Sequence, residues 1–195
     1  MTTVGALAAA DAASQWDAEG GAPMELAIAF TDLEDFTAYT EAEGDNAASR
    51  LLIGHHRESV EIVHDRGGRV LKWLGDGLML TFPEPEAAVL ACLDLGESAP
   101  LRLRAGIHVG HVMMVSDDVF GHVVNLAARV AGSAAGGQLV VTDHVRRAIG
   151  DVHGIAFDGP HLRTFKGIEG EVSVYVTTRS LRLEALPRIN WIKPD

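Results

Sequence analysis

Two aspartates stand where a divalent metal ion could be held. Asp32 directly follows an apolar strand predicted over residues 24–31, and Asp76 lies at the Gly-Asp-Gly tip of a hairpin predicted over residues 69–82. Carboxylates that converge from a strand end and a neighbouring hairpin tip bind hard divalent ions, which prefer oxygen ligands and phosphate partners. Either aspartate alone is more often a turn residue or a helix cap. The metal-site hypothesis therefore depends on both aspartates and on the segments around them.

A lysine in the first strand of the hairpin is the next candidate for chemistry. Lys72 lies among the apolar residues Leu71, Trp73 and Leu74, and a charge in such surroundings carries a desolvation cost. Successive side chains of a strand point to opposite faces, so Trp73 is interpreted as a packing residue on the face away from Lys72. The pattern indicates that the positive charge of Lys72 is kept in spite of this desolvation cost.

The hydrophobic pattern around these residues predicts an α+β fold. Helices are expected from residue 35 and over 46–64, 83–95, 125–131 and 143–149, strands over 24–31, 138–142 and 171–177, and a pair of strands within 101–115. Gly106 and Gly110 are expected to allow a close backbone approach. The order β-α-β-β-α-β, with further elements after it, is typical of the ferredoxin-like plan, an antiparallel sheet with helices on one face.

Size and charge limit the class of protein. The 195 residues suffice for one domain, expected over residues 24–179 between tails at 1–23 and 180–195. A formal net charge of -11, with no run of lysine or arginine, argues against nucleic acid or a membrane surface as a partner. No apolar run approaches the ~20 residues that cross a bilayer, and no basic segment marks a secretory signal. The single cysteine, Cys92, cannot form an internal disulfide, so we expect a cytoplasmic protein.

Four segments combine these candidates with further polar residues. They are Phe30-Thr31-Asp32-Leu33-Glu34-Asp35-Phe36-Thr37, Gly67-Gly68-Arg69-Val70-Leu71-Lys72-Trp73-Leu74-Gly75-Asp76, Asp118-Val119-Phe120-Gly121-His122-Val123-Val124-Asn125-Leu126-Ala127-Ala128-Arg129, and Lys166-Gly167. In this order and at these spacings they resemble the signatures of the class III nucleotidyl cyclases, the family of adenylate and guanylate cyclase catalytic domains. The resemblance covers about residues 25–178 and implies the ferredoxin-like core of that family.

The resemblance implies where metal and phosphate bind. Asp32 and Asp76 would hold two Mg²⁺ or Mn²⁺ ions per active site, and the carbonyl of Leu33 would complete one coordination shell. Backbone N–H groups at the start of a helix would bind the β- and γ-phosphates, as helix N-termini do. These groups belong to Leu33, Glu34, Asp35 and Phe36.

It also implies the substrate and the reaction. Lys72 would donate to adenine N1 and Asp118 would accept from the 6-amino group, which predicts ATP as the substrate. Asn125 would orient the ribose, and Arg129 would stabilise charge on the α-phosphate as the 3′-hydroxyl attacks it. Asn125 and Arg129 are four residues apart, so a helix places them on one face. Lys166 would bind the triphosphate and assist the departure of pyrophosphate.

Family active sites lie across a two-fold interface, which predicts a homodimer. The metal aspartates come from one subunit, and Lys72, Asp118, Asn125, Arg129 and Lys166 come from the other. This chain carries both sets, so a symmetric dimer would have two composite sites. The predicted activity is that of an adenylate cyclase that produces 3′,5′-cyclic AMP and pyrophosphate. A guanylate or dual-specificity cyclase, and a non-catalytic cyclase-like module that binds a nucleotide or a partner, remain the alternatives.

One position departs from the pattern of the family. Residue 35 is commonly glycine in the family and is Asp35 here. A carboxylate near a triphosphate would weaken binding unless it turns away, and aspartate caps helices well, so we interpret Asp35 as a helix cap. With Glu34 beside it, the turn is unusually acidic, which would raise the requirement for metal ions.

Overall fold

The computed structural model describes residues 24–180. The predicted tail at 1–23 and all but the first residue of the tail predicted at 180–195 lie outside the described residues. Within residues 24–180, no helix is both long and apolar enough to cross a membrane.

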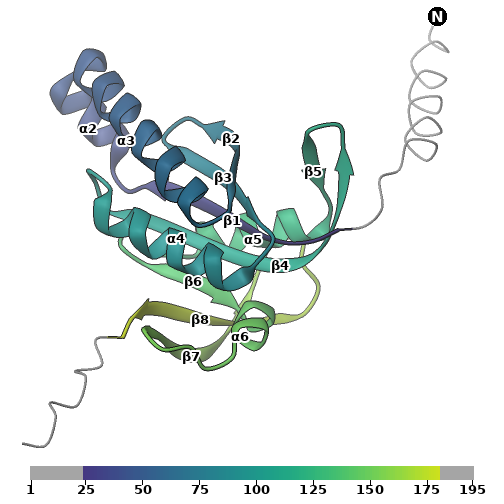
Figure 1. Cartoon of the computed structure of the whole chain (residues 1–195). Helices are drawn as coiled ribbons and strands as arrows, with labels where there is room; N and C mark the ends of the chain where they lie inside the picture. Colours follow the sequence, from purple (N-terminus) through teal and green to yellow (C-terminus); the bar gives the residue numbers. More distant parts are fainter. Residues whose placement is uncertain (1–23, 181–195) are drawn as a thin grey trace, which may run out of the picture.

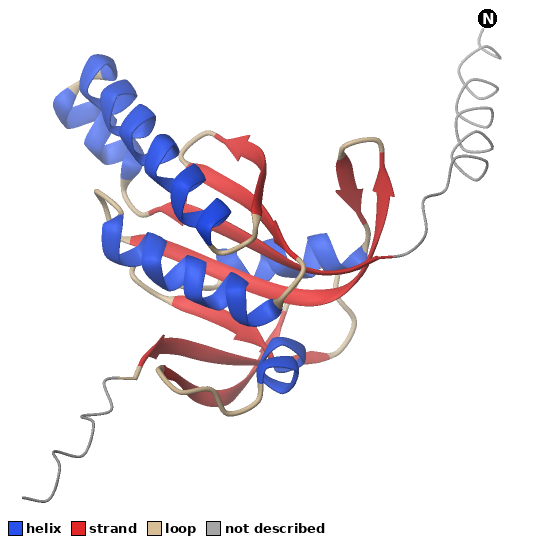
Figure 2. Cartoon of the chain, viewed as in Figure 1, coloured by secondary structure: helices blue, strands red, loops and turns tan. Residues whose placement is uncertain are grey.

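The described residues form a sheet flanked by helices (Figures 1 and 2). The strands are β1 (Met24–Leu33), β2 (Arg69–Leu74), β3 (Gly77–Phe82), β4 (Leu103–Val115), β5 (Asp118–Phe120), β6 (Leu139–Thr142), β7 (Ile155–Thr164) and β8 (Glu171–Arg179). The helices are α2 (Phe36–Glu43), α3 (Asp45–Asp65), α4 (Pro85–Ser98), α5 (His122–Gly132) and α6 (Asp143–Ile149). The strand order is β2-β3-β1-β4-β6-β8-β7, and β5 pairs with β4.

The ferredoxin-like core predicted from the sequence is present. Strands β2, β3, β1 and β4 lie side by side and pair antiparallel. Beyond this core the prediction of an antiparallel sheet was wrong, because β6 pairs parallel to β4. The full sheet is therefore mixed.

Helices cover both faces of the sheet, whereas the sequence predicted one. Ala27 and Ala29 of β1 pack in the cluster that includes residues of α3, α4 and α6, while Leu26 and Ile28 pack in the cluster that includes residues of α5. Figure 1 shows α3 and α4 in front of the sheet and α5 behind it. The cause is the alternation of side chains along a strand that is apolar on both faces.

Glycine brings α5 onto this second face. A Cβ atom on Gly106 of β4 would overlap the backbone of Ala131 in α5. This confirms the close approach expected at Gly106, and it fixes α5, the helix of Asn125 and Arg129, against the middle of the sheet.

Two strand predictions were wrong. The pair of strands expected within residues 101–115 is one continuous strand, β4, which pairs with β1 along the whole of Met24–Leu33. Strand β7 was not predicted, because most of its side chains are exposed and it contains Gly159 and Pro160. Such a composition is tolerated at a sheet edge, where β7 lies.

Candidate active site

The end of β1, the start of α2 and the tip of the β2–β3 hairpin surround a pocket of about 680 Å³. Its lining residues are Asp32, Leu33, Glu34, Asp35, Phe36, Thr37, Ala38, Glu41, Asp76 and Arg104. A Cβ atom on Gly77 would lie 2.5 Å from the carbonyl oxygen of Thr31. Glycine is therefore needed for the hairpin to bring Asp76 this close to the end of β1.

The two predicted metal aspartates face each other in this pocket. Burial and the neighbouring charge of Asp32 raise the pKa of Asp76, and a backbone hydrogen bond from Leu33 opposes that rise. Two carboxylates that repel each other in a polar pocket form a donor set of hard oxygens, which fits Mg²⁺ or Mn²⁺. Within residues 24–180 no group of three or more His, Cys, Asp or Glu side chains could hold a metal ion. Further ligands would therefore have to come from the backbone, water or substrate.

The backbone N–H groups predicted to bind phosphate differ in whether they already have a hydrogen-bond partner. The N–H of Glu34 donates to the carbonyl oxygen of Arg102 at 2.9 Å. The Glu34 N–H was one of the four groups expected to bind phosphate, and in this structure it already has a partner. The first N–H groups of α2, which begins at Phe36, have no intrahelical partner. These groups belong to Phe36, Thr37 and Ala38, which line the pocket.

Asp35 does not act as the predicted side-chain cap. It occupies the N-cap position of α2, but its side chain makes no capping hydrogen bond. Its φ of 62° and ψ of 19° lie in the left-handed region, which glycine adopts without strain. The backbone geometry gives a physical reason for the glycine that is common at this position.

The side chain of Glu34 is held by the loop between α5 and β6. Its Oε1 accepts from the backbone N–H of Gly136 at 2.9 Å, and its Oε2 lies 3.3 Å from Nη1 of Arg102. The Arg102 guanidinium also donates to the Gly136 carbonyl oxygen. The expected acidity of the turn is thus partly neutralised, and the turn is tied to the loop between α5 and β6.

Sequence reasoning missed Arg104, which lines the same pocket as Asp32 and Asp76. Arg104 is the β4 neighbour of Asp32 across the sheet, and its Nε donates to Asp32 Oδ2 at 2.7 Å. A second donor of the guanidinium, Nη2, bonds the same oxygen. The available signal was an arginine inside the apolar segment Leu103–Val115, but its partner depended on strand register.

The residues predicted to read the base lie together. Lys72 Nζ is 2.6 Å from Asp118 Oδ2, and the ammonium group lies 5.6 Å from the centre of the Phe120 ring. The hydrogen bond from Lys72 lowers the pKa of Asp118. Trp73 points away, as predicted, but it is half-exposed and packs on the His56 ring at 4.1 Å between centroids.

The remaining predicted residues lie elsewhere on the surface. Asn125 and Arg129 are both exposed on α5, so the shared helix face is present. Lys166 is exposed in the turn between β7 and β8. Together with Lys72 and Asp118, none of these residues lines the pocket of the metal aspartates. In one chain, the two predicted halves of the site are therefore separate.

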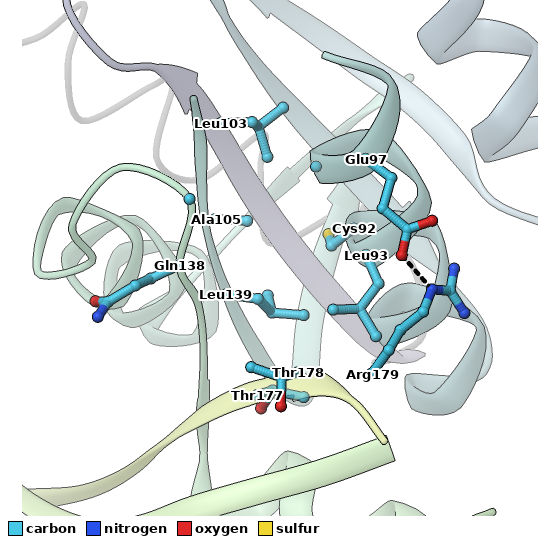
Figure 3. Close-up of a pocket in the computed structure, with 12 residues that line it drawn as sticks. Cys92, Leu93, Glu97, Leu103, Ala105, Gln138, Leu139, Thr177, Thr178 and Arg179 are labelled. Atoms are coloured by element: carbon cyan, nitrogen blue, oxygen red, sulfur yellow. Dashed lines mark hydrogen bonds and ion pairs between the residues drawn. The ribbon is translucent and has the colours of Figure 1, made fainter. Parts of the chain in front are cut away.

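A smaller cavity of about 230 Å³ lies between α4 and strands β4, β6 and β8 (Figure 3). Leu93, Leu103 and Leu139 line it, and Glu97 accepts a hydrogen bond from Arg179 beside it at 2.5 Å. It contains none of the predicted site residues.

Comparison with known proteins agrees with this architecture. The family model of the adenylate and guanylate cyclase catalytic domain matches residues 22–178. The uncharacterized protein Rv2212 of Mycobacterium tuberculosis (strain H37Rv) is 35% identical over 159 residues, 79% of this chain and 41% of that protein. The pH-sensitive adenylate cyclase MT1302 of M. tuberculosis (strain CDC 1551) is 32% identical over 168 residues, 80% of this chain and 41% of that protein. The chain thus spans about 41% of the length of these curated relatives.

Solved structures show the same fold. The adenylyl cyclase CyaB from P. aeruginosa superposes with a TM-score of 0.72 at 22% identity, covering 83% of this chain and 97% of that one. The guanylyl cyclase Cya2 superposes with a TM-score of 0.70 at 20% identity, covering 85% and 98%. Four motifs in order, a mixed sheet built on a ferredoxin-like core, and a family match over nearly all described residues lead to one conclusion. The chain belongs to the family of adenylate and guanylate cyclase catalytic domains.

Proposed function

We propose that this chain is an adenylate cyclase, which converts ATP to 3′,5′-cyclic AMP and pyrophosphate at sites shared across a homodimer. The observation that carries the proposal is the 2.6 Å contact of Lys72 Nζ with Asp118 Oδ2. It sets a hydrogen-bond donor directly beside an acceptor, on side chains that remain partly exposed.

This pair matches the edge of adenine. Adenine presents an acceptor at N1 beside a donor at the 6-amino group, which complements Lys72 and Asp118. Guanine in the same orientation presents an N–H to the lysine and a carbonyl oxygen to the aspartate, so both groups would lose a partner. Each unpaired group costs about 1–3 kcal/mol, so the two together predict a preference for ATP over GTP of at least about thirtyfold.

The separation of the two half-sites supports the homodimer. Asp32 and Asp76 line one pocket, whereas Lys72, Asp118 and Arg129 lie outside it. A two-fold dimer in which each chain gives its metal half to one site and its base-reading half to the other has two complete sites. A single chain would have none.

The pocket fits two Mg²⁺ or Mn²⁺ ions held by Asp32 and Asp76. When bound, such ions neutralise phosphate charge and lower the pKa of the ribose 3′-hydroxyl. With Asp32 engaged by a cation, the guanidinium of Arg104 would be released toward the triphosphate in the same pocket. The N–H groups at the start of α2 would bind further phosphate oxygens.

The exposed residues of α5 and the β7–β8 turn would complete the site from the other subunit. Asn125 would hold the ribose so that its 3′-hydroxyl lies in line with the α-phosphate. Arg129 would stabilise the charge that develops on that phosphate. Lys166 would bind the leaving pyrophosphate.

The test is cyclic nucleotide production from ATP and from GTP, with Mg²⁺ and with Mn²⁺. We expect cyclic AMP as the main product, and we expect Arg129→Ala to lose most of the activity. A higher rate with GTP would replace the proposal by a guanylate cyclase. No product from either nucleotide, from a folded dimer, would favour a non-catalytic module.

Complementation tests the shared site. Asp76→Ala and Arg129→Ala homodimers should both be inactive. Random exchange makes half of the dimers mixed, and each mixed dimer has one intact site, so about a quarter of wild-type activity should return. If mixing restores nothing although subunits exchange, the two halves do not serve the same site.

A further inference from the structure

A group of cations without carboxylate partners gathers at the end of α5. In the described chain most cationic side chains pair with a carboxylate, namely Arg66, Arg69, Lys72, Arg102, Arg104, Arg146, Arg147 and Arg179. Within residues 24–180, those with no such pair are Arg50, Arg57, Arg129, Arg163 and Lys166. The first two are exposed on α3, whereas the last three lie on α5, on β7 and in the turn that follows it.

Two of these cations line one pocket. It has a volume of about 430 Å³ and is formed by Ala128, Arg129, Gly132, Ser133, Arg163, Thr164 and Phe165. No aspartate or glutamate is among the lining residues. In a protein with a net charge of -11, a pocket with two guanidinium groups and no carboxylate favours an anion. Its volume is in the range of small-ligand sites.

Within residues 24–180, the side chain of Arg163 makes one hydrogen bond, which leaves most of its donors available. Its Nη1 donates to the carbonyl oxygen of Ser133 at 2.7 Å, and Ser133 is the C-cap residue of α5. A cation at a helix C-terminus stabilises the helix, which explains this one bond. Arginine has five N–H donors, so a capping role alone does not account for the rest of the guanidinium.

The same bond holds the guanidinium in a fixed place beside the reaction site. It attaches Arg163 to the end of the helix that carries Arg129, one turn beyond it. A donor held in advance loses less entropy when it binds, and paired guanidinium groups bind phosphate oxygens strongly. We infer that Arg163 is a phosphate-binding residue, which joins Arg129 in binding the polyphosphate of the nucleotide in the pocket between α5 and β7. This inference rests on the proposed function and adds a residue to it.

Three variants test the inference by activity. Arg163→Gln removes the charge, Arg163→Lys keeps it, and Arg57→Gln removes an exposed charge without a carboxylate partner on α3 as the matched control. Loss of a charged hydrogen bond predicts about a tenfold rise in the KM for ATP and in the inhibition constant of pyrophosphate for Arg163→Gln. We expect kcat to change less than KM, Arg163→Lys to recover part of both constants, and Arg57→Gln to match the wild type.

A binding measurement separates this inference from the proposed function. Inorganic tripolyphosphate is titrated into the wild type, Arg163→Gln and Arg57→Gln by calorimetry, and the thermal midpoint of each variant is recorded. Weaker binding by Arg163→Gln alone, measured well below the thermal midpoint of every variant, supports the anion pocket even if no cyclic nucleotide is ever formed. If Arg163→Gln equals Arg57→Gln in KM, in pyrophosphate inhibition and in tripolyphosphate affinity, Arg163 is only a helix cap and the inference is wrong.

Discussion

Replacing Asp35 tests whether the phosphate-binding turn is held in a left-handed conformation. Asp35 has a φ of 62° and no side-chain capping bond. The left-handed region costs a residue with a Cβ about 1–2 kcal/mol, less for aspartate and asparagine. Glycine avoids that cost but loses about 0.5–1 kcal/mol of entropy on folding. Asp35→Gly should therefore be as stable as the wild type or more stable, by up to ~1 kcal/mol.

Two further substitutions at this position separate strain from charge. Alanine has a Cβ and tolerates the left-handed region less well than aspartate does, so Asp35→Ala should be about 1 kcal/mol less stable than Asp35→Gly. Asp35→Asn keeps the backbone preference and removes only the charge. Because the carboxylate lines the proposed phosphate pocket, Asp35→Asn and Asp35→Gly should both lower the KM for ATP, on the order of fivefold for ~1 kcal/mol of repulsion.

Urea unfolding gives the stability of each variant, and steady-state cyclic AMP formation gives KM. If Asp35 capped α2, Asp35→Gly would lose a few tenths of a kcal/mol instead of gaining. Equal stabilities of the Gly and Ala variants would refute the left-handed geometry. An unchanged KM in the Asn variant would show that the carboxylate does not act on the phosphates.

Three other predictions address the base, the packing of α5 and acid stability. Lys72→Glu should reduce the ATP rate and raise the GTP-to-ATP rate ratio by about tenfold, because it replaces the donor with an acceptor; an unchanged ratio in a cyclic nucleotide assay would contradict the role of Lys72. Gly106→Ala should destabilise the fold by about 3 kcal/mol or more, as measured by urea unfolding, because the added Cβ overlaps α5. Gly96→Ala is the control: its Cβ meets nothing within 4 Å, so this variant should be neutral or stabilising. Burial lowers the pKa of His55 and of His108 from 6.5 to about 4. As the pH falls, the two histidines are protonated in the unfolded state before they are protonated in the folded state. Their contribution to the free energy of unfolding is therefore fully present above pH 6.5 and is lost as the pH drops from 6.5 toward 4. His55→Gln should make that fall shallower by about one proton, as measured by urea unfolding at each pH, and an unchanged slope would show that His55 does not titrate in this range.

Local sequence pattern was enough to predict where several residues of the candidate site lie in the fold. Asp32 ends an apolar strand and Asp76 stands in a Gly-Asp-Gly turn, so both the position and the hairpin could be predicted. Asn125 and Arg129 needed only the period of a helix. The core order of the first four strands followed from the order of the elements, because few topologies satisfy β-α-β-β-α-β.

What could not be predicted depends on contacts between distant segments. Glu34 bonds Gly136, 102 residues later, and Arg104 bonds Asp32, 72 residues earlier. The partner of Arg104 is visible only when the register of β1 and β4 is known, and the partner of Glu34 only when the loop between α5 and β6 is placed. Strand β7 was missed for a different reason, because an exposed edge strand has no apolar alternation to detect.

The β2–β3 hairpin has a consequence for how the two half-sites act together. Lys72 and Asp76 are four residues apart on this hairpin, yet Lys72 contacts Asp118 of β5 while Asp76 lines the pocket at the end of β1. Lys72 lies in β2 and Asp76 in the turn that follows it, and their side chains contact different elements, so we assign them to different groups of the nucleotide. In the proposed homodimer they would belong to different active sites. A displacement of this one hairpin would then change base recognition in one site and the metal pocket in the other, and the sites would respond together to any contact that moves it.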